Sequence, residues 1–410
     1  MYDCVSQFQD YFNYPTSTVI STVQEVPTQF PVISFCNMKL LNRSNPNTKS
    51  YISNNTVIGQ ASNFLLRFVY ANDQKLSMEN RKEFGYKIEN MLVFEPPNYW
   101  CNFNNDFCSP IDFTYFYNSA YGNCYSFNIG YFDNGTKYDI KQSSTSDKLF
   151  GLNMALFVGD PAIDTSKEEA DGIVLSIHNQ TIAPFTKGRA INVPAGAETD
   201  IIINRNFIKT LPSPYGDCLD DTTVNSTFNS AFFDYIVRTL QQGYSQEYCY
   251  SFCLQKETIN HCGCSNAFLP VFSNTTIFCA NATQYNCVWK VNALYGNEFT
   301  DYGKTSCPFE CSSVEYIPRS SSALYPTVYK LNSLLNKYNY SLRITNLQYA
   351  SQAFIRLNVY YERMEYTTTT QNAKFQPSDL VSSFGGTLGL FLGINNIYLK
   401  YTIVCTKANL

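Results

Sequence analysis

The stretch from Cys249 to Cys264 reads CYSFCLQKETINHCGC and places four cysteines within sixteen residues. The whole chain has 15 cysteines but only two histidines, His178 and His261, that could help them hold a metal. So many cysteines are unusual in a reducing compartment, and disulfides are the better interpretation. A zinc site at Cys262-x-Cys264 is the alternative, although structural zinc sites more often use Cys-x2-Cys pairs. We therefore expect an oxidised, extracellular fold without a metal site.

Composition limits the class of protein further. The 410 residues are 44% hydrophobic and 16% aromatic, which is far from the composition of a disordered chain. No linker, repeat or long charge run divides them, so we expect one multi-lobed body. The net charge is -4 with no basic stripe, which argues against nucleic acid as a partner. The sequence also lacks a nucleophile elbow and a phosphate loop, so we expect neither an enzyme nor a bound cofactor.

Potential N-glycosylation sites support an extracellular location. Eight Asn-x-Ser/Thr sequons occur, and all lie between Cys36 and Tyr360. They begin at Asn42, Asn54, Asn134, Asn179, Asn225, Asn274, Asn281 and Asn339. We predict that this interval is translocated and glycosylated.

Hydrophobic periodicity predicts an α+β fold with a sheet core and peripheral helices. Residues 354–365 (FIRLNVYYERME) alternate apolar and polar side chains, which predicts a long half-buried strand. Shorter strands are expected at 172–177 and 199–203. Helices are expected at 78–91, 228–242, 246–259 and 325–338.

The two ends differ from the middle. Residues 384–404 (FGGTLGLFLGINNIYLKYTIV) are mostly apolar and about as long as a membrane crossing requires. Asn395, Asn396 and Lys400 are costly in lipid, so a buried hydrophobic hairpin is the alternative. Residues 1–14 lack the pattern of a signal peptide and fit the outer end of a truncated first membrane helix.

Several motifs follow one another in a fixed order. They are 30–37 (FPVISFCN), 121–128 (YGNCYSFN), 177–180 (IHNQ) with 184–185 (PF), 211–218 (LPSPYGDC), 307–311 (CPFEC), 320–326 (SSSALYP) and 385–393 (GGTLGLFLG). In order and spacing they resemble the degenerin/epithelial sodium channel family, and the resemblance covers nearly the whole chain. It implies a multi-pass plasma-membrane protein with two transmembrane helices, which assembles as a trimer surrounded by membrane lipid.

The resemblance also implies how the chain is divided. Residues 1–14 would end the first membrane helix, 15–378 would form the extracellular domain, and 379–410 would form the second membrane helix and the pore. A β-sheet palm would carry peripheral helices in a finger at about 50–120 and a thumb at about 219–325. The implied disulfides are Cys36–Cys124, Cys101–Cys108, Cys218–Cys311, Cys249–Cys307, Cys262–Cys287 and Cys264–Cys279. Cys253 would be left unpaired.

Pore residues follow from the same resemblance. The filter for the permeant Na⁺ would be Gly393-Ile394-Asn395, with asparagine where relatives have serine. Gly385, Gly386 and Gly389 would line the pore, amiloride would act at Gly389, and Ser382 matches the position that gates degenerins. Tyr14 would stack on Tyr215 to couple the thumb to the first helix.

The stimulus that would open such a channel is inferred by excluding the stimuli of other branches of the family. Acid-sensing relatives use paired carboxylates, and from Cys264 to Cys307 we find only Glu298 and Asp301. Epithelial relatives have arginine-rich cleavage sites in the finger, which residues 51–108 lack. The sequence is therefore most like the branch opened by FMRFamide-like neuropeptides. Proton, mechanical or constitutive gating remain alternatives, and a Cys-rich cell-surface adhesion protein is the rival from another class.

Overall fold

The computed structural model describes residues 9–54, 76–95, 97–161, 170–185, 190–272, 277–295, 305–338, 352–387, 389–390 and 393. Two β-sheets share one hydrophobic core, as expected from the sequence. The large sheet has the strand order β1-β17-β14-β16-β11-β6-β7, and β15 also pairs with β14. Its strands are β1 (Thr16–Gln24), β6 (Cys101–Phe103), β7 (Asp106–Phe107), β11 (Leu152–Phe157), β14 (Ala197–Lys209), β15 (Ser312–Leu324), β16 (Phe354–Tyr361) and β17 (Glu365–Ala373).

The second sheet has five strands and is the most buried part of the molecule. Its order is β13-β12-β3-β9-β8. The strands are β3 (Val32–Asn37), β8 (Phe113–Asn118), β9 (Gly122–Phe127), β12 (Gly172–His178) and β13 (Ala190–Pro194). Every residue of β3, β9 and β12 is buried, including polar side chains such as Asn123, Ser126 and His178. Two short pairs complete the strands, β2 (Thr28–Gln29) with β10 (Gln142–Ser143) and β4 (Phe94–Glu95) with β5 (Asn98–Tyr99).

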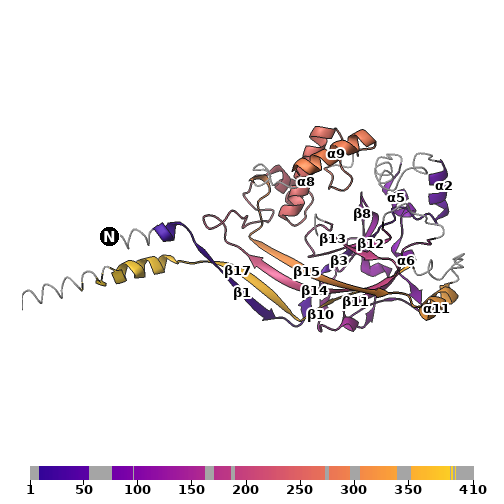
Figure 1. The fold of residues 1–410 in the computed structure, drawn as a ribbon, viewed down its shortest axis with the longest axis horizontal. Coiled ribbons are helices and arrows are strands. Elements are labelled where there is room, and N and C mark those ends of the chain that lie inside the picture. The colour runs from indigo at the N-terminus through magenta and orange to yellow at the C-terminus, as the bar shows by residue number, and fades with distance from the viewer. Residues whose placement is uncertain are drawn as a thin grey trace, which may run out of the picture.

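Helices cover the periphery (Figure 1). They are α2 (Pro46–Asn54), α5 (Met78–Phe84), α6 (Ile88–Met91), α7 (Ala231–Phe233), α8 (Gln246–Cys262), α9 (Ala282–Tyr295) and α11 (Val328–Tyr338). A π-helical turn at Asp234–Thr239 follows α7. We call residues 219–311, which include α7, α8 and α9, the helical lobe.

The predicted helix at 246–259 is confirmed as α8, which extends to Cys262. Its ends have clear causes. The Ser245 hydroxyl accepts a hydrogen bond from the Tyr248 amide at the first turn, and Gly263 ends the helix with φ 65°.

The predicted helix at 78–91 is wrong in its middle, because it is interrupted at Gly85. The cause is a side chain from β9. The Asn123 amide nitrogen donates to the carbonyls of Lys82 (2.8 Å) and Tyr86 (3.2 Å), which removes them from a continuous helix. A Cβ on Gly85 would lie only 2.5 Å from that nitrogen. The predicted helix at 228–242 is likewise shorter and irregular, spanning only 231–239.

The predicted strand at 354–365 is confirmed as β16 but ends at Tyr361, and its predicted alternation fails at one position. Asn358, expected on the exposed face, is fully buried between the neighbouring strands β11 and β14. Its amide donates to Asp200 (2.8 Å) and Glu198 (3.0 Å). The strands predicted at 172–177 and 199–203 are confirmed within β12 and β14. The helix predicted at 325–338 is confirmed as α11, but it begins only at Val328.

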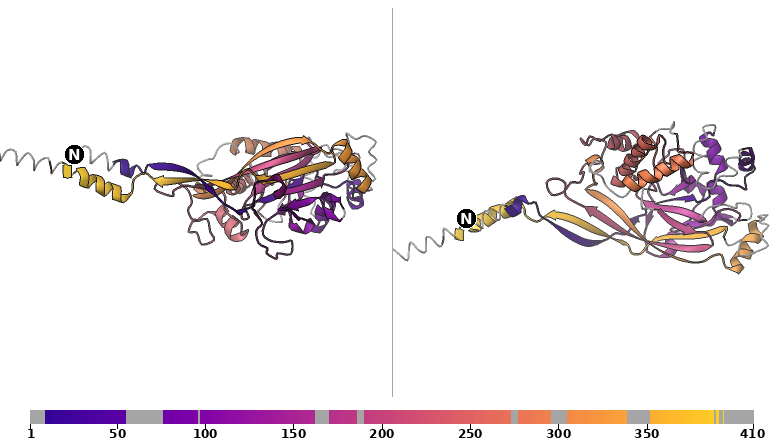
Figure 2. Two further views of the ribbon diagram at one scale, coloured as in Figure 1. Left: turned by 90° about the horizontal axis from the view of Figure 1, so that it is seen from below. Right: turned by 45° about the horizontal axis from the view of Figure 1, so that its top comes forward.

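The first and the last described helical segments lie at the same end of the molecule (Figure 1). The helical residues 9–12 and 377–387 extend side by side beyond β1 and β17, away from the sheets and the lobe (Figures 1 and 2). Among the described residues, no helix combines the length and the apolar character needed to cross a membrane.

Candidate gating junction and pore segment

The two terminal helices share one support, the antiparallel pair of β1 and β17, which we call the ribbon. Its register runs from Thr16 opposite Ala373 to Gln24 opposite Glu365. Tyr14 lies just before β1, and the second helical segment begins at residue 377, just after β17. A displacement of the ribbon would therefore move both terminal helices together.

The loop of residues 211–217 lies against the start of the ribbon. The ring centroids of Tyr14 and Tyr215 are 5.3 Å apart, with an interplanar angle of 81°. The Tyr215 amide donates to the Pro212 carbonyl (3.0 Å), which closes the turn. A Cβ on Gly216 would approach the Leu211 carbonyl oxygen to 2.8 Å, so the turn depends on glycine at this position. The contact implied by the resemblance is present.

The other side of the loop is joined to the helical lobe. Cys218 and Cys311 form a disulfide, and the Thr210 amide donates to the Cys311 carbonyl (2.8 Å). Leu219 and Cys311 are also linked by a backbone hydrogen bond of 2.9 Å. Cys311 thus fixes both ends of the 211–217 loop.

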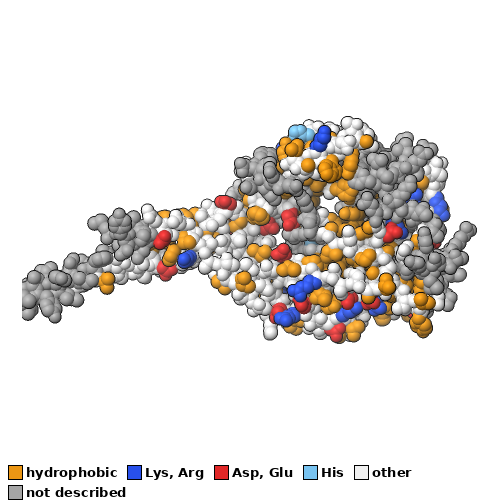
Figure 3. All heavy atoms as spheres, viewed as in Figure 1, with side chains coloured by type: hydrophobic (Ala, Val, Ile, Leu, Met, Phe, Trp, Pro, Cys, Tyr) orange, Lys and Arg blue, Asp and Glu red, His pale blue; other side chains and the backbone are white. Residues whose placement is uncertain are grey.

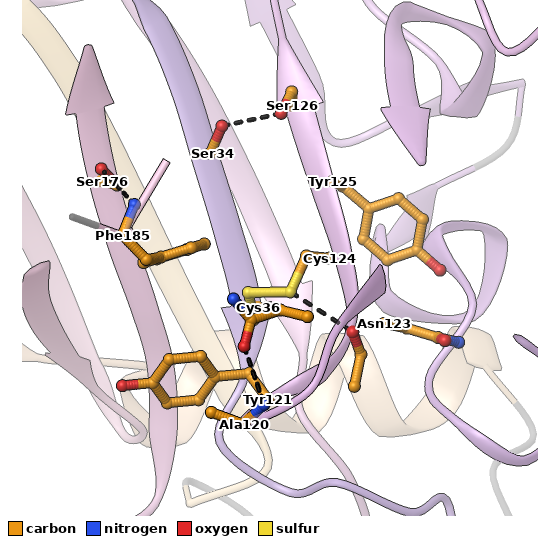
Figure 4. Close-up of a disulfide and its surroundings, with 12 residues drawn as sticks. Ser34, Cys36, Ala120, Tyr121, Asn123, Cys124, Tyr125, Ser126, Ser176 and Phe185 are labelled. Atoms are coloured by element: carbon orange, nitrogen blue, oxygen red, sulfur yellow. Dashed lines mark hydrogen bonds between the residues drawn. A yellow bond between two sulfur atoms is a disulfide. The ribbon is translucent and has the colours of Figure 1, made fainter. Parts of the chain in front are cut away.

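The structure contains the six disulfides that the resemblance implied. They are Cys36–Cys124, Cys101–Cys108, Cys218–Cys311, Cys249–Cys307, Cys262–Cys287 and Cys264–Cys279. Figure 4 shows the first of these joining β3 to β9, beside the rings of Tyr121 and Phe185. Cys253 is free and buried in the lobe, where desolvation raises the pKa of its thiol to about 11. Among the described residues, no group of His, Cys, Asp and Glu side chains could hold a metal ion.

The glycines assigned to the pore lie on the second terminal helix. Ser382, Gly385, Gly386 and Gly389 are exposed, and Gly393 is half-buried. No atom lies within 4 Å of a Cβ built on any of these glycines. The described part of one chain therefore leaves this small-residue segment uncovered. Ile394, Asn395, Asn396 and Lys400, like Cys4 and Cys405, lie outside the described residues.

Most described sequons are open to modification. Asn54, Asn134, Asn225 and Asn281 are exposed, whereas Asn42 and Asn179 are half-buried. Asn274 and Asn339 lie outside the described residues.

A groove of about 730 Å³ lies between the helical lobe and the five-stranded sheet. Its lining side chains are all uncharged, and many are aromatic. They include Phe116, Tyr117, Phe185, Tyr248, Tyr250 and Phe268. A second groove of about 620 Å³, at the base of the lobe, has four carboxylates in its lining, Asp217, Glu247, Glu310 and Glu315. Over the face of the molecule seen in Figure 3, acidic and basic side chains are scattered among hydrophobic ones rather than gathered in one patch.

A proton sensor would need carboxyl groups whose pKa lies near neutral pH. Four described carboxyl groups depart clearly from their usual pKa, and each pKa is lowered. Hydrogen bonds from Lys87, Thr223 and Asn204 lower the pKa of Glu83, Asp221 and Glu362, respectively. Burial would raise the pKa of Glu198, but its hydrogen bond with Lys148 and the charges of Arg356 and Lys148 outweigh that effect.

The sequence did not predict a buried arginine that contacts the ribbon. Arg205 of β14 is buried, forms an ion pair with Glu25, and lies 4.9 Å from the Phe207 ring centroid and 5.0 Å from that of Tyr366. It fixes the base of the ribbon to β14. A signal was available, because Arg205 continues the buried alternation of Ile201 and Ile203.

Comparison with known proteins agrees with this arrangement. The family model described as amiloride-sensitive sodium channel matches residues 1–397. The chain is 24% identical over 330 residues to epithelial sodium channel subunit gamma-2 of Xenopus laevis, which covers 79% of the chain and 46% of that protein. It is 26% identical over 420 residues to the bile acid-sensitive ion channel of Homo sapiens (95% of the chain, 74% of the relative). It is 28% identical over 300 residues to degenerin mec-10 of Caenorhabditis elegans (72% and 38%).

The chain spans about half the length of the epithelial sodium channel subunits it matches. The family model nevertheless covers nearly all of the chain, from the first terminal helix to the glycines of the second. The protein therefore belongs to the amiloride-sensitive sodium channel family, which includes epithelial sodium channels and degenerins.

Proposed function

We propose that the chain is one subunit of a homotrimeric channel that conducts Na⁺ across the plasma membrane. The observation that carries the proposal is the uncovered small-residue segment, Ser382 to Gly389, on a helix supported by the ribbon. With closed three-fold symmetry, each residue of that segment becomes a ring of three. Glycines permit the close approach of helices that a narrow pore in lipid requires.

Within this pore, Gly393-Ile394-Asn395 forms the selectivity filter, Gly385 and Gly386 line the pore, and amiloride blocks at Gly389. Backbone carbonyls and the Asn395 side-chain oxygen would replace part of the hydration shell of Na⁺. Asparagine is bulkier than the serine of relatives, so Asn395→Ser should raise conductance and the preference for Na⁺ over K⁺. Reversal potentials in mixed Na⁺ and K⁺ solutions measure this change.

In this proposal, a movement of the helical lobe is transmitted through the 211–217 loop to Tyr14, and from there to the ring of three Ser382 residues that gates the pore. An aromatic pair contributes roughly 0.5–1.5 kcal/mol beyond burial, enough to bias an open–closed equilibrium by up to about tenfold. We expect Tyr215→Ala to weaken activation with unchanged surface expression. Tyr329→Ala is the control, because Tyr329 is 87% exposed on α11. Normal gating of Tyr215→Ala would refute the coupling.

The proposed stimulus is a FMRFamide-like neuropeptide. An uncharged aromatic groove suits phenylalanine side chains better than it suits a proton sensor, and the lowered carboxyl pKa values also argue against acid. The other candidate contacts are in the finger. Residues 64–70 lie outside the described residues, and in 84–99 Tyr86 is buried in the core while Phe84 stacks on Tyr51 at 4.9 Å. Phe94, in the same range, is 39% exposed, so the finger and the groove are both tested as peptide contacts.

Two-electrode recording from cells that express the full-length protein tests the proposal. FMRFamide-type peptides, acid and a bile acid are applied in turn, with and without amiloride. A peptide-evoked Na⁺ current that amiloride blocks supports the proposal. A current evoked only by acid or bile acid keeps the channel and overturns the peptide. No current despite surface expression favours mechanical gating, a heteromeric subunit, or the adhesion protein.

A further inference from the structure

A glutamine near the end of the ribbon makes a side-chain contact with the 211–217 loop. Gln371 lies on β17, opposite Thr18 of β1. Its amide nitrogen donates to the Thr16 hydroxyl (2.8 Å), and its amide oxygen accepts the Leu211 backbone N–H (3.0 Å). One side chain thus joins β1, β17 and the loop.

The register explains why a side chain is needed at this point. β14 and β17 pair in parallel from Asn206 opposite Thr367 to Lys209 opposite Thr370. β14 ends there, and the Thr210 amide donates to the Cys311 carbonyl on the side of β15. The next amide, that of Leu211, donates to a side chain of β17 and not to its backbone. Gln371, the next residue of β17, supplies the missing acceptor from its side chain.

The register of the ribbon explains why the Gln371 side chain reaches Thr16. Gln371 is directly opposite Thr18, and residues two positions apart on a strand share one face. Thr16 is therefore the diagonal neighbour of Gln371, within reach of a long side chain. An amide is suited to this place because it both donates and accepts, whereas a carboxylate only accepts.

From these contacts we infer that Gln371 is a positioning residue for gating, a second link beside the Tyr14–Tyr215 contact. The loop between the two links is held by Cys311 at Thr210 and at Cys218. A movement of the helical lobe displaces Cys311 and with it the loop. The loop then pulls on the ribbon at Gln371 and on the first helix at Tyr14.

The inference rests on the proposed function, and the variants are chosen to separate the two hydrogen bonds. Gln371→Met keeps the length of the side chain and removes both bonds. Thr16→Val removes only the acceptor on β1. Gln24→Met is the matched control, because Gln24 is an exposed residue at the far end of the same ribbon.

Full-length channels are recorded with the peptide, and surface protein is measured in parallel. We expect Gln371→Met to raise the half-activating peptide concentration about 3- to 10-fold, the range of one to two net hydrogen bonds. Thr16→Val should have a smaller effect, and Gln24→Met none. Wild-type activation of Gln371→Met, or an equal shift in Gln24→Met, would overturn the inference.

A second readout does not need current. Hydrogen–deuterium exchange of the purified full-length protein should become faster at the Leu211 amide in Gln371→Met and remain unchanged in Gln24→Met. Equal protection of that amide in wild type and Gln371→Met would overturn the inference even if the wild type were silent. A silent wild type with faster exchange at Leu211 in Gln371→Met would instead refute the proposed function and leave the link between loop and ribbon established.

Discussion

Removing the disulfide between Cys218 and Cys311 tests the connection between the helical lobe and the ribbon most directly. The two cysteines are 93 residues apart, but the Cys249–Cys307 bond is nested inside and spans 58 of them. The cross-link therefore closes an effective loop of about 35 residues. In the chain-entropy model, a loop of that length contributes about 4 kcal/mol at 25 °C. We expect Cys218→Ala/Cys311→Ala to lose about that much stability.

Urea-dependent proteolysis of the detergent-solubilised full-length protein measures this loss, as cleavage within residues 219–248. Cys253→Ala is the matched control, because it removes a buried sulfur from the same lobe without breaking a cross-link. It should cost only about 1 kcal/mol. If the double variant resisted cleavage as well as Cys253→Ala does, the disulfide would not be what holds the lobe to the loop, and the entropic reasoning would fail.

Three other perturbations test separate parts of the structure. Arg205→Met removes a buried ion pair and two cation–π contacts and should cost roughly 2–4 kcal/mol in thermal unfolding, more than Glu25→Gln, because the Glu25 side chain is 39% exposed. The lowered pKa of Glu198 adds stability that is present above its unfolded pKa of about 4.3 and is lost as pH falls through the folded value. The unfolding temperature of the wild type should therefore fall more than that of Glu198→Gln when the pH is lowered below about 4. His178→Ala should cost about 1–3 kcal/mol and speed amide exchange in β3, because the ring nitrogens lie 2.8 Å from the Ser34 hydroxyl and the Asn179 carbonyl.

The sequence predicted the class of fold because its strongest signals are local. Alternation of apolar residues located β14 and β16, and three- and four-residue spacing located α11 and the helical residues 231–239. The pairing of the cysteines came from the family resemblance, since spacing alone leaves the connectivity open. Other features were missed. No residue of β15 is buried and its sequence has no apolar alternation, although it pairs with β14 along its whole length.

Non-local contacts could not be predicted in the same way. The break at Gly85 depends on Asn123, a residue from another strand that takes two carbonyls out of the helix. The burial of Asn358 depends on having a strand on each side of β16. The residues around Gly85 and Asn358 carry no local signal for these contacts, because each contact depends on how strands far apart in the chain are aligned. The same is true of Gln371, whose role is visible only once the end of the β14–β17 pairing is known.

The arrangement at the junction has a consequence for how a stimulus would act. The 211–217 loop has two weak contacts to the terminal segments, the edge-on contact of Tyr215 with Tyr14 and the hydrogen bond from the Leu211 amide to Gln371, but it is held to the lobe by a covalent bond. Each weak contact contributes of the order of 1 kcal/mol, whereas a disulfide resists far larger changes. A moving lobe would therefore carry the loop with it, and the weak contacts are where the motion would be transmitted or lost. Variants at Tyr215 and Gln371 should consequently change the sensitivity of gating, whereas loss of Cys311 should uncouple the lobe.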